Sequence, residues 1–376
     1  NRPALPDEIE VIVFKLSGKC NTDNLSPGPD APTRSDIPLH AKGMLRMRAP
    51  DALAEITELR GDDSIVALCG DDLWGGSSRK SAWNSVAWNM GEGIPYIPNK
   101  GSRAIVIGGA IAPIGRDTIR DSGGLAIICD VTRIESGSTI KIRPGDGQIQ
   151  DSDNTTLAEF DMPDYWRDEW RAGGRLNLVT GRKLTTKARE ALTLPASTVF
   201  VVREAPADTG KGFTLGQKQL GRACGLAGVR TGQYVEPKMS TVASQDTTGK
   251  MTRDEIAEQA CVQFGADLVL QSFCHTAATP KATDLEMHQT LPVFMTERGG
   301  VSLRPGDGVI HTWINRMLLP DEVGTGGDSH TRFPLGISFP AGSGLVAYAA
   351  ANGFMPLDVP KTVLVKFEGE LHPGIT

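Results

Sequence analysis

Short apolar runs separated by polar turns dominate the first part of the chain. Such runs predict β-strands, and they occupy residues 8–16, 64–69, 104–107, 125–129 and three stretches within 138–160. Apolar side chains from Trp83 to Met90 recur at helical spacing, which predicts an amphipathic helix after the loop 70–76. Residues 17–38 hold several prolines and predict a long loop. Strand, loop and helix in this order indicate one compact, β-rich α/β domain.

The pattern changes after the glycine pair Gly173-Gly174. A polar stretch with several Lys and Arg residues follows and predicts a linker. Beyond it, helical patterns at 215–224 and 253–264 alternate with short apolar runs that predict strands at 268–270, 309–310 and 363–367. The sequence therefore predicts an α/β protein with a first domain over 1–174, a linker over 175–211 and a second α/β domain over 212–376.

Charge and cysteine content narrow the classes of function. The 376 residues hold 39 Lys and Arg against 45 Asp and Glu, a net charge of -6, so no global basic field exists to bind nucleic acid. No apolar stretch approaches the ~20 residues that cross a bilayer, and the first residues lack the pattern of a signal peptide. The six cysteines form no C-x-x-C pair, which predicts mostly buried free thiols in a cytoplasmic protein.

The segment from Gly75 to Arg79 is the first candidate binding site. It lies between a predicted strand and a predicted helix, where glycines allow close backbone approach and the first helical N–H groups attract an anion. The hydroxyls of Ser77 and Ser78 can donate hydrogen bonds. The guanidinium of Arg79 can bind a carboxylate through two parallel N–H···O hydrogen bonds. The alternative is that one serine only caps the helix while Arg79 lies in solvent.

A second polar loop, Ser-Gln-Asp-Thr-Thr-Gly at 244–249, precedes a helix predicted over 251–264. Its short donors and acceptors can hold a carboxylate or a polyhydroxy ligand. Thr252 and Glu255 have the spacing of a capping box, so the loop can equally be an ordinary helix entry.

Four of the six histidines fall between residues 275 and 330. His275, His311 and His330 follow short apolar runs, at strand ends where α/β proteins place ligands. Asp328 and Ser329 precede His330 on a glycine-rich turn, and a carboxylate beside an imidazole keeps that ring charged and oriented for proton donation. A purely structural role and the binding of Zn²⁺ or Fe²⁺ are the alternatives, although no H-x-x-H or H-E-x-x-H pattern supports a metal.

Taken together, these strings resemble the aconitase superfamily and, within it, the bacterial aconitase B branch. The matching segments are 24–27, 34–40, 76–81, 244–249, 304–311 and 326–333. They cover essentially the whole chain, and the Gly-Ser-Ser-Arg loop precedes the second domain, as it does in this branch. The resemblance implies a β/β/α swivel domain, a linker and the first part of a three-layer α/β/α catalytic domain.

The resemblance also implies a reaction and residue roles. The reaction is the reversible conversion of citrate to isocitrate through cis-aconitate, with 2-methylisocitrate as a further substrate in this branch. Ser77 corresponds to the base that removes the proton. The implied substrate contacts are Arg34, Ser78 and Arg79 on the first domain and Gln245, Asp246, Thr247 and Ser329 on the second. His275, His311 and the pair Asp328 and His330 correspond to the proton relay at the leaving hydroxyl. The acid that orients His275 stays undetermined, because Cys274 stands where related proteins have an aspartate.

The [4Fe-4S] cluster of the family is held by three cysteines, two of them in a C-x-x-C pair, and this sequence contains no such pair. We therefore expect an interior piece of a longer aconitase that holds no metal and is inactive alone, with the remainder of the enzyme as its partner. Two other classes stay open. One is a carboxylate-binding or RNA-binding module, since cluster-free aconitases can bind RNA, although the acidic charge balance disfavours it. The other is a related dehydratase of the isopropylmalate isomerase type.

Overall fold

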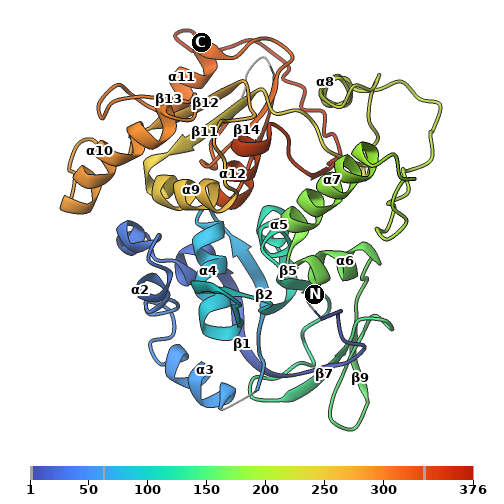
Figure 1. Cartoon of the computed structure of the whole chain (residues 1–376). Coiled ribbons are helices and arrows are strands. Elements are labelled where there is room, and N and C mark those ends of the chain that lie inside the picture. The colour runs from blue at the N-terminus through green and yellow to red at the C-terminus, as the bar shows by residue number, and fades with distance from the viewer. Residues whose placement is uncertain (1–2, 62–63, 333–335, 376) are drawn as a thin grey trace.

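Two large β-sheets, each with its own helices, organise the described residues in a computed structural model (Figure 1). The structure describes residues 3–61, 64–332 and 336–375. The seven-stranded sheet and its helices are called the first domain below, and the five-stranded sheet and its helices the second. Each of the four hydrophobic clusters found among the described residues lies within one domain, so apolar packing stabilises each domain separately.

The sheet of the first domain has the strand order β6-β5-β2-β1-β7-β8-β9. Its parallel half consists of β1 (Ile9–Asn21), β2 (Val66–Gly75), β5 (Ile105–Ile111) and β6 (Leu125–Ile128). Its antiparallel half consists of β7 (Thr139–Arg143), β8 (Gln148–Gln150) and β9 (Thr156–Glu159). All the strands predicted in this part of the sequence are present.

Alternation along the parallel strands sends side chains to two different cores. Phe14, Leu68 and Val106 pack with the helices α3 (Ala52–Arg60) and α4 (Arg79–Met90) on one face. Their chain neighbours Val13 and Ala67 point to the other face, where residues of β7, β8 and α6 (Tyr165–Ala172) complete the core. Helices α3 and α4 thus cover one face, whereas the antiparallel strands of the same sheet and helix α6 complete the core on the other.

Two predictions for the polar segments of the first half were wrong in detail. The predicted loop 17–38 contains the end of β1 and three short helical segments, α1 (Thr22–Leu25), η1 (Gly28–Thr33) and α2 (Ile37–Ala41). The predicted linker begins with a regular helix, α7 (Arg175–Ala191), whose polar surface hid its helical period. The remaining elements of this half are the hairpin β3 (Glu92–Ile94) and β4 (Ile97–Ser102), and α5 (Pro113–Asp121).

The sheet of the second domain is entirely parallel, in the order β13-β12-β11-β14-β15. Its strands are β11 (Thr241–Gln245), β12 (Leu268–Ser272), β13 (Val301–Ser302), β14 (Val323–Gly326) and β15 (Ile337–Pro340). One face packs against α8 (Leu215–Ala223), α9 (Asp246–Glu258), α10 (Ala282–Thr296) and α12 (Ser343–Asn352). The other packs against α11 (Ile310–Met317), which makes three layers. A two-stranded ribbon, β10 (Tyr234–Val235) with β16 (Leu357–Asp358), completes the domain.

Two of the strands predicted for the second domain do not form. Residues 309–310 lie at the start of α11, and the strand that precedes this helix is β13. Residues 363–367 are irregular, and Phe367 is 93% exposed. An apolar run becomes a strand only where a neighbouring strand offers hydrogen bonds and cover, and the described residues offer none there.

The state of the cysteines and the length of the helices can be compared with the sequence-based expectations of free thiols and of no membrane-spanning segment. All six cysteines are free, four of them buried and two half-buried, as predicted. Among the described residues, no helix is both long and apolar enough to cross a membrane.

Candidate active site

The second domain has a crevice at the point where its strand order reverses. From β11 the chain continues to β12 on one side, whereas β14 lies on the other side of β11. In parallel α/β sheets ligands bind at such a point, beyond the carboxyl ends of the strands. The segments that follow β11, β12 and β14 carry Asp246, His275 and Asp328 to this edge. The predicted placement at strand ends agrees with this arrangement for His275 and His330 but is wrong for His311, which lies in the first turn of α11.

The polar loop predicted at 244–249 is itself the start of a helix. Helix α9 begins at Asp246, with Gln245 as its N-cap, whose Oε1 accepts a hydrogen bond from the N–H of Thr247 at 2.8 Å. Thr252 and Glu255 lie inside this helix, so the capping box predicted for them is wrong. The N-terminus of α9 therefore lies at the crevice, where the helix dipole favours an anion.

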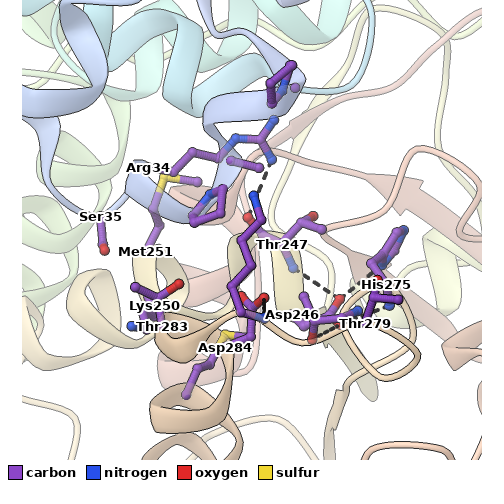
Figure 2. A pocket seen from close by; sticks show the side chains of 17 residues that line it. Arg34, Ser35, Asp246, Thr247, Lys250, Met251, His275, Thr279, Thr283 and Asp284 are labelled. Carbon is purple, nitrogen blue, oxygen red and sulfur yellow. Dashed lines mark hydrogen bonds and ion pairs between the residues drawn. The ribbon is translucent and has the colours of Figure 1, made fainter.

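Asp246 is the acid that orients His275. Its fully buried carboxylate accepts from the N–H of His275 at 2.9 Å and of Thr276 at 2.8 Å, and it lies 2.9 Å from His275 Nδ1 (Figure 2). The Asp246 contact, followed by that of Cys274, raises the pKa of His275 to about 10, against the opposing effect of burial. His275 therefore carries a proton on each ring nitrogen at neutral pH.

Cys274 adds a thiol to this cluster. Its Sγ lies 3.4 Å from His275 Nδ1 and 3.5 Å from Ser272 Oγ. Burial alone would raise the pKa of the thiol, but hydrogen bonds from His275 and Ser272 outweigh it and lower that pKa below its ordinary value. The sequence marked Cys274 only as a departure from related proteins and gave no sign of this contact.

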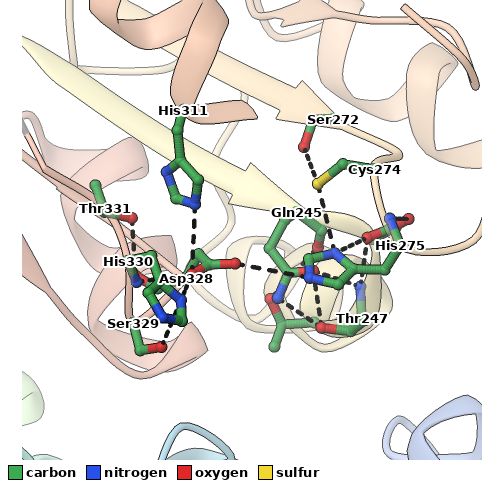
Figure 3. Close-up of polar contacts among 12 residues, drawn as sticks. Gln245, Thr247, Ser272, Cys274, His275, His311, Asp328, Ser329, His330 and Thr331 are labelled. Carbon is green, nitrogen blue, oxygen red and sulfur yellow. Dashed lines mark hydrogen bonds and ion pairs between the residues drawn. The ribbon is translucent and has the colours of Figure 1, made fainter. Parts of the chain in front are cut away.

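Asp328 is the centre of the histidine cluster (Figure 3). One of its oxygens lies 3.2 Å from His330 Nδ1 and 3.6 Å from His311 Nε2, and the other lies 3.7 Å from His275 Nε2. Burial raises the pKa of Asp328, but the N–H of His330 and the nearby imidazoles lower it by a larger amount. The pKa of Asp328 is therefore below its ordinary value, and the carboxyl group is ionised. The turn also brings Ser329 Oγ within 3.3 Å of His330 Nδ1. The three predicted histidines and their predicted acid are thus together.

The first domain approaches the cluster with the turn between β2 and α4. Gly76 has a φ of +120°, and a Cβ there would lie 2.3 Å from Thr22 Oγ1, so only glycine fits. Ser77 is exposed and Ser78 is buried at the N-cap of α4. The Ser78 hydroxyl makes no cap; it accepts from Arg34 Nη2 at 2.7 Å and lies 3.5 Å from Asp23 Oδ1. The interpretation of this serine as a helix cap is therefore wrong.

Arg34 and Arg79 are both buried at the boundary between the domains. Arg79, only 4% exposed, reaches the carbonyl of Ala341 at 3.5 Å, and Arg34 reaches the carbonyl of Thr247 at 3.4 Å. The Nε atom of each guanidinium is buried and has no hydrogen-bond partner among the described residues. A buried donor without a partner is costly, so both groups fit an anion placed between the domains. The alternative of a solvated Arg79 is wrong.

A cavity of about 270 Å³ opens beside these residues (Figure 2). It is lined by four of the predicted site residues, namely Arg34, Asp246, Thr247 and His275, together with Lys250 and residues of η1 and α10. Ser77, Arg79 and the Asp328 cluster lie outside its lining.

Sequence reasoning did not find two residues that touch the turn at Ser78. Asp23 and Thr22 were detectable only as neighbours of the matched segment 24–27, because their contact with Ser78 spans 55 and 56 residues.

The described residues offer one group of three side chains that could hold a metal ion, namely Asp246, Cys274 and His275. It contains a single thiol, and the other cysteines lie elsewhere. A [4Fe-4S] cube needs several converging thiolates, so the side chains of this chain alone do not fit such a cluster.

The fold and the site define a class of protein: a two-domain α/β protein in which buried arginines of one domain lie at the boundary with a second domain that carries an Asp–His cluster. The family described as Aconitate hydratase 2 N-terminus matches residues 11–213, and the Aconitase family (aconitate hydratase) matches residues 228–376. The chain belongs to the aconitate hydratase family. The predicted family and fold class are confirmed.

Two curated relatives illustrate this membership, and a third is similar over part of the chain. The chain is 59% identical over 377 residues to aconitate hydratase B of Synechocystis sp., and 56% identical over 388 residues to aconitate hydratase B of Escherichia coli. All of the chain is covered in both comparisons, but only 43% and 45% of the relatives, so the chain spans less than half their length. The large subunit of 3-isopropylmalate dehydratase from Elusimicrobium minutum is 28% identical over 156 residues, which cover 39% of the chain.

Proposed function

We propose that this chain forms the substrate-binding part of an aconitate hydratase that interconverts citrate and isocitrate through cis-aconitate. One observation carries the proposal: Arg34 and Arg79 are buried on one domain, and their Nε donors have no partner among the described residues. Arg79 lies near Asp328 of the other domain, and Arg34 shares a cavity with Asp246 and His275. A ligand that joins the two sides must be small, anionic and rich in carboxylates, which describes these three acids.

Binding follows from donors that converge on the boundary between the domains. Helices α4 and α9 both direct their N-termini there, and helix N-termini favour anions. We assign carboxylate contacts to Arg34, Ser78 and Arg79 on the first domain. On the second, we assign substrate contacts to the first turn of α9, from Gln245 to Thr247, and to Ser329.

The elimination of water needs a base at carbon and an acid at oxygen. We assign the base to Ser77, which is exposed at the N-terminus of α4, where an alkoxide is stabilised. As the C–H bond breaks, its electrons form the double bond of cis-aconitate and the C–O bond breaks. The leaving hydroxyl takes a proton and departs as water. We assign that proton to His275, with Asp328 holding His311 and His330 beside it.

The cofactor and the remaining partners belong to the complete enzyme. We propose that a [4Fe-4S] cluster, held by cysteines outside this chain, supplies a Lewis-acidic iron for the substrate hydroxyl. We also propose 2-methylisocitrate as a further substrate, and a cytoplasmic location, which the free thiols favour.

The test uses the full-length enzyme carrying Ser77→Ala. We expect kcat to fall at least a thousandfold, roughly the loss when a catalytic base is removed, while the Kd for citrate changes little. Turnover is measured by the ultraviolet absorbance of the cis-aconitate double bond, and binding by calorimetry. A variant that keeps a tenth of the wild-type kcat would remove Ser77 from the role of base.

A second test addresses the chain by itself. Anaerobic reconstitution with iron and sulfide, followed by electron paramagnetic resonance of the reduced protein, should give no stoichiometric cluster signal, because the thiols do not converge. A full signal would show that this chain holds the cofactor unaided.

An isopropylmalate dehydratase is the second candidate function. The similarity to the Elusimicrobium subunit over 39% of the chain favours it. Comparison of kcat/KM for isocitrate and isopropylmalate in the full-length enzyme separates the two, and we expect isocitrate to be preferred.

A further inference from the structure

A buried histidine, His40 of α2, lies behind the substrate site and has no part in the chemistry assigned above. It is 2% exposed, and both ring nitrogens have hydroxyl partners. Nε2 lies 2.8 Å from Ser26 Oγ, and Nδ1 lies 2.9 Å from Thr33 Oγ1. The imidazole therefore bridges two points of the segment 26–36 from inside the first domain.

One arm of this bridge leads to helix α4. Ser26 Oγ lies 2.6 Å from Ser81 Oγ, and Ser81 Oγ lies 3.1 Å from the carbonyl oxygen of Ser78. Ser81 is in the first turn of α4, and Ser78 is its N-cap. This arm thus ends at the backbone of the Gly-Ser-Ser-Arg turn that carries Ser77.

The other arm leads to Arg34. Thr33 immediately precedes Arg34, and its hydroxyl also donates to the carbonyl of Asp30 at 2.8 Å. That donation uses the only proton of the Thr33 hydroxyl, so Thr33 Oγ1 accepts from Nδ1–H of His40. In the neutral ring Nε2 then accepts from the Ser26 hydroxyl, and Ser26 Oγ accepts from the hydroxyl of Ser81. Burial, helped by the charge of Arg34, lowers the pKa of His40 to about 4, in agreement with a neutral ring.

We propose that His40 is a positioning residue that fixes Arg34 and the N-terminus of α4 relative to each other. The proposal rests on the proposed function, since both elements are assigned there to the substrate. Arg34 Nη2 donates to Ser78 Oγ at 2.7 Å, so the two elements already touch at the site. A donor on one side of the ring and an acceptor on the other keep that contact in one geometry, without any contact between His40 and the substrate.

The two arms allow a test in which each is cut separately in the full-length enzyme. Thr33→Val removes the hydroxyl beside Arg34, and we expect it to raise the KM for isocitrate about tenfold with kcat within about twofold of wild type. Ser26→Ala removes the link to α4, and we expect it to lower kcat about tenfold because Ser77 moves. Thr33→Ser keeps the hydroxyl and should restore the wild-type KM.

Ser85→Ala is the matched control. Ser85 is equally buried in α4 and donates to the carbonyl of Ser81 at 3.1 Å, but it lies outside both arms. Thermal melting of every variant separates lost stability from lost positioning. If Ser26→Ala fails to fold, the comparison of Thr33→Val with Thr33→Ser decides alone.

The outcomes distinguish two failures. His40 has only a structural role if the wild type converts isocitrate and both arm variants behave like Ser85→Ala. The same conclusion follows if, in both variants, the fall in kcat and the rise in KM are proportional to the fall in melting temperature. If the wild-type enzyme is inactive on citrate and isocitrate, the proposed function fails, and this proposal fails with it. Separate effects on KM and kcat with rescue by Thr33→Ser would support the positioning role.

Discussion

At the scale of single residues, the site relies on guanidinium groups that are kept away from water. Arg79 is 4% exposed and lies close enough to Asp328 for that carboxylate to oppose the lowering of its pKa by burial. Arg79→Lys keeps the charge but replaces a planar fork by a point charge. In the full-length enzyme we expect kcat/KM to fall about tenfold or more, with both KM and kcat affected.

Steady-state kinetics on isocitrate check this expectation, with Arg46→Lys as the control. Arg46 makes a surface ion pair with Asp30 and is 52% exposed, so its replacement should leave the kinetics unchanged. Unchanged KM and kcat in Arg79→Lys would mean that Arg79 does not touch the substrate.

The protonation of His275 depends on Asp246. In Asp246→Asn we expect the pKa of His275 to fall from about 10 toward its ordinary 6.5, because the first and largest cause of the shift is removed. Ring resonances followed by NMR as a function of pH measure this directly. Asp284→Asn, in the lining of the same cavity but bonded to the N–H of Lys281, is the control and should leave the pKa of His275 in place.

The stability of the protein should follow the same titration. A pKa that is higher in the folded state contributes stability that is complete below pH 6.5 and lost as the pH rises toward 10. Urea unfolding between these pH values should show that loss in the wild type and much less of it in Asp246→Asn. A His275 pKa that stays near 10 in the variant would assign the shift to Cys274 instead.

Residue types and spacing were enough to find much of the site but not its internal partners. Ser77 to Arg79 and the three histidines stood out because glycines, hydroxyls and charges gather next to apolar runs. The acid beside His275 was not found, since Asp246 lies 29 residues away in the sequence and meets it only at the sheet edge. The burial of Arg34 and Arg79 likewise depends on the approach of the other domain.

At the scale of elements, the turn between β2 and α4 sets the position of Ser77. Gly76→Ala would place a Cβ 2.3 Å from Thr22 Oγ1 at a φ of +120°, whereas Gly75→Ala meets nothing closer than 3.5 Å. We expect Gly76→Ala to cost ~1–3 kcal/mol of unfolding free energy and most of the turnover, because the start of α4 must shift. Gly75→Ala should be close to wild type in both.

Urea unfolding of the chain and kinetics of the full-length enzyme measure the two effects of Gly76→Ala. Equal behaviour of the two alanine variants would show that this turn tolerates a side chain and does not fix the base.

In the first domain, the strands with an apolar run between polar turns were predicted correctly, because burial on a sheet produces that pattern. Helix α7 was missed because only Arg175 and Val179 are buried along it, which leaves too few apolar positions to show a helical period. The strand expected at 363–367 is the opposite error. Its apolar pattern is strong, but a strand also needs a partner that the sequence pattern does not supply.

At the scale of the whole molecule, ion pairs join the domains at two places. Near the site, Lys80 and Lys100 of the first domain meet Glu255 of α9 at 3.3 and 3.5 Å, and Lys100 also binds Glu258. Near α7, Arg120 and Arg175 approach Asp358 of β16 at 3.8 and 4.0 Å. A polar boundary of this kind is typical of domains that move relative to each other.

We expect the first domain to open and close as a rigid body over the substrate site. Glu255→Gln leaves Lys80 without its carboxylate at a buried position, and opening the cleft is the simplest way to hydrate that ammonium. In the full-length enzyme the variant should show a larger distance between spin labels on α4 and α9, and a higher KM for isocitrate.

Glu286→Gln is the control for domain opening, since it removes an ion pair with Lys250 that lies within the second domain. Addition of citrate should shorten the label distance in both the wild type and Glu255→Gln. A distance that is the same in all variants, with and without citrate, would mean that the two domains form one rigid body.

The separation of the hydrophobic clusters has a thermodynamic consequence for this motion. Because each cluster lies within one domain, opening exposes charged and polar groups and little apolar surface. The heat-capacity change of opening should therefore be small, and temperature should hardly displace the equilibrium. Ionic strength should displace it instead, since salt screens the outer ion pairs. The ionic strength in the cell, rather than the temperature, would therefore determine the fraction of molecules whose cleft is open to substrate.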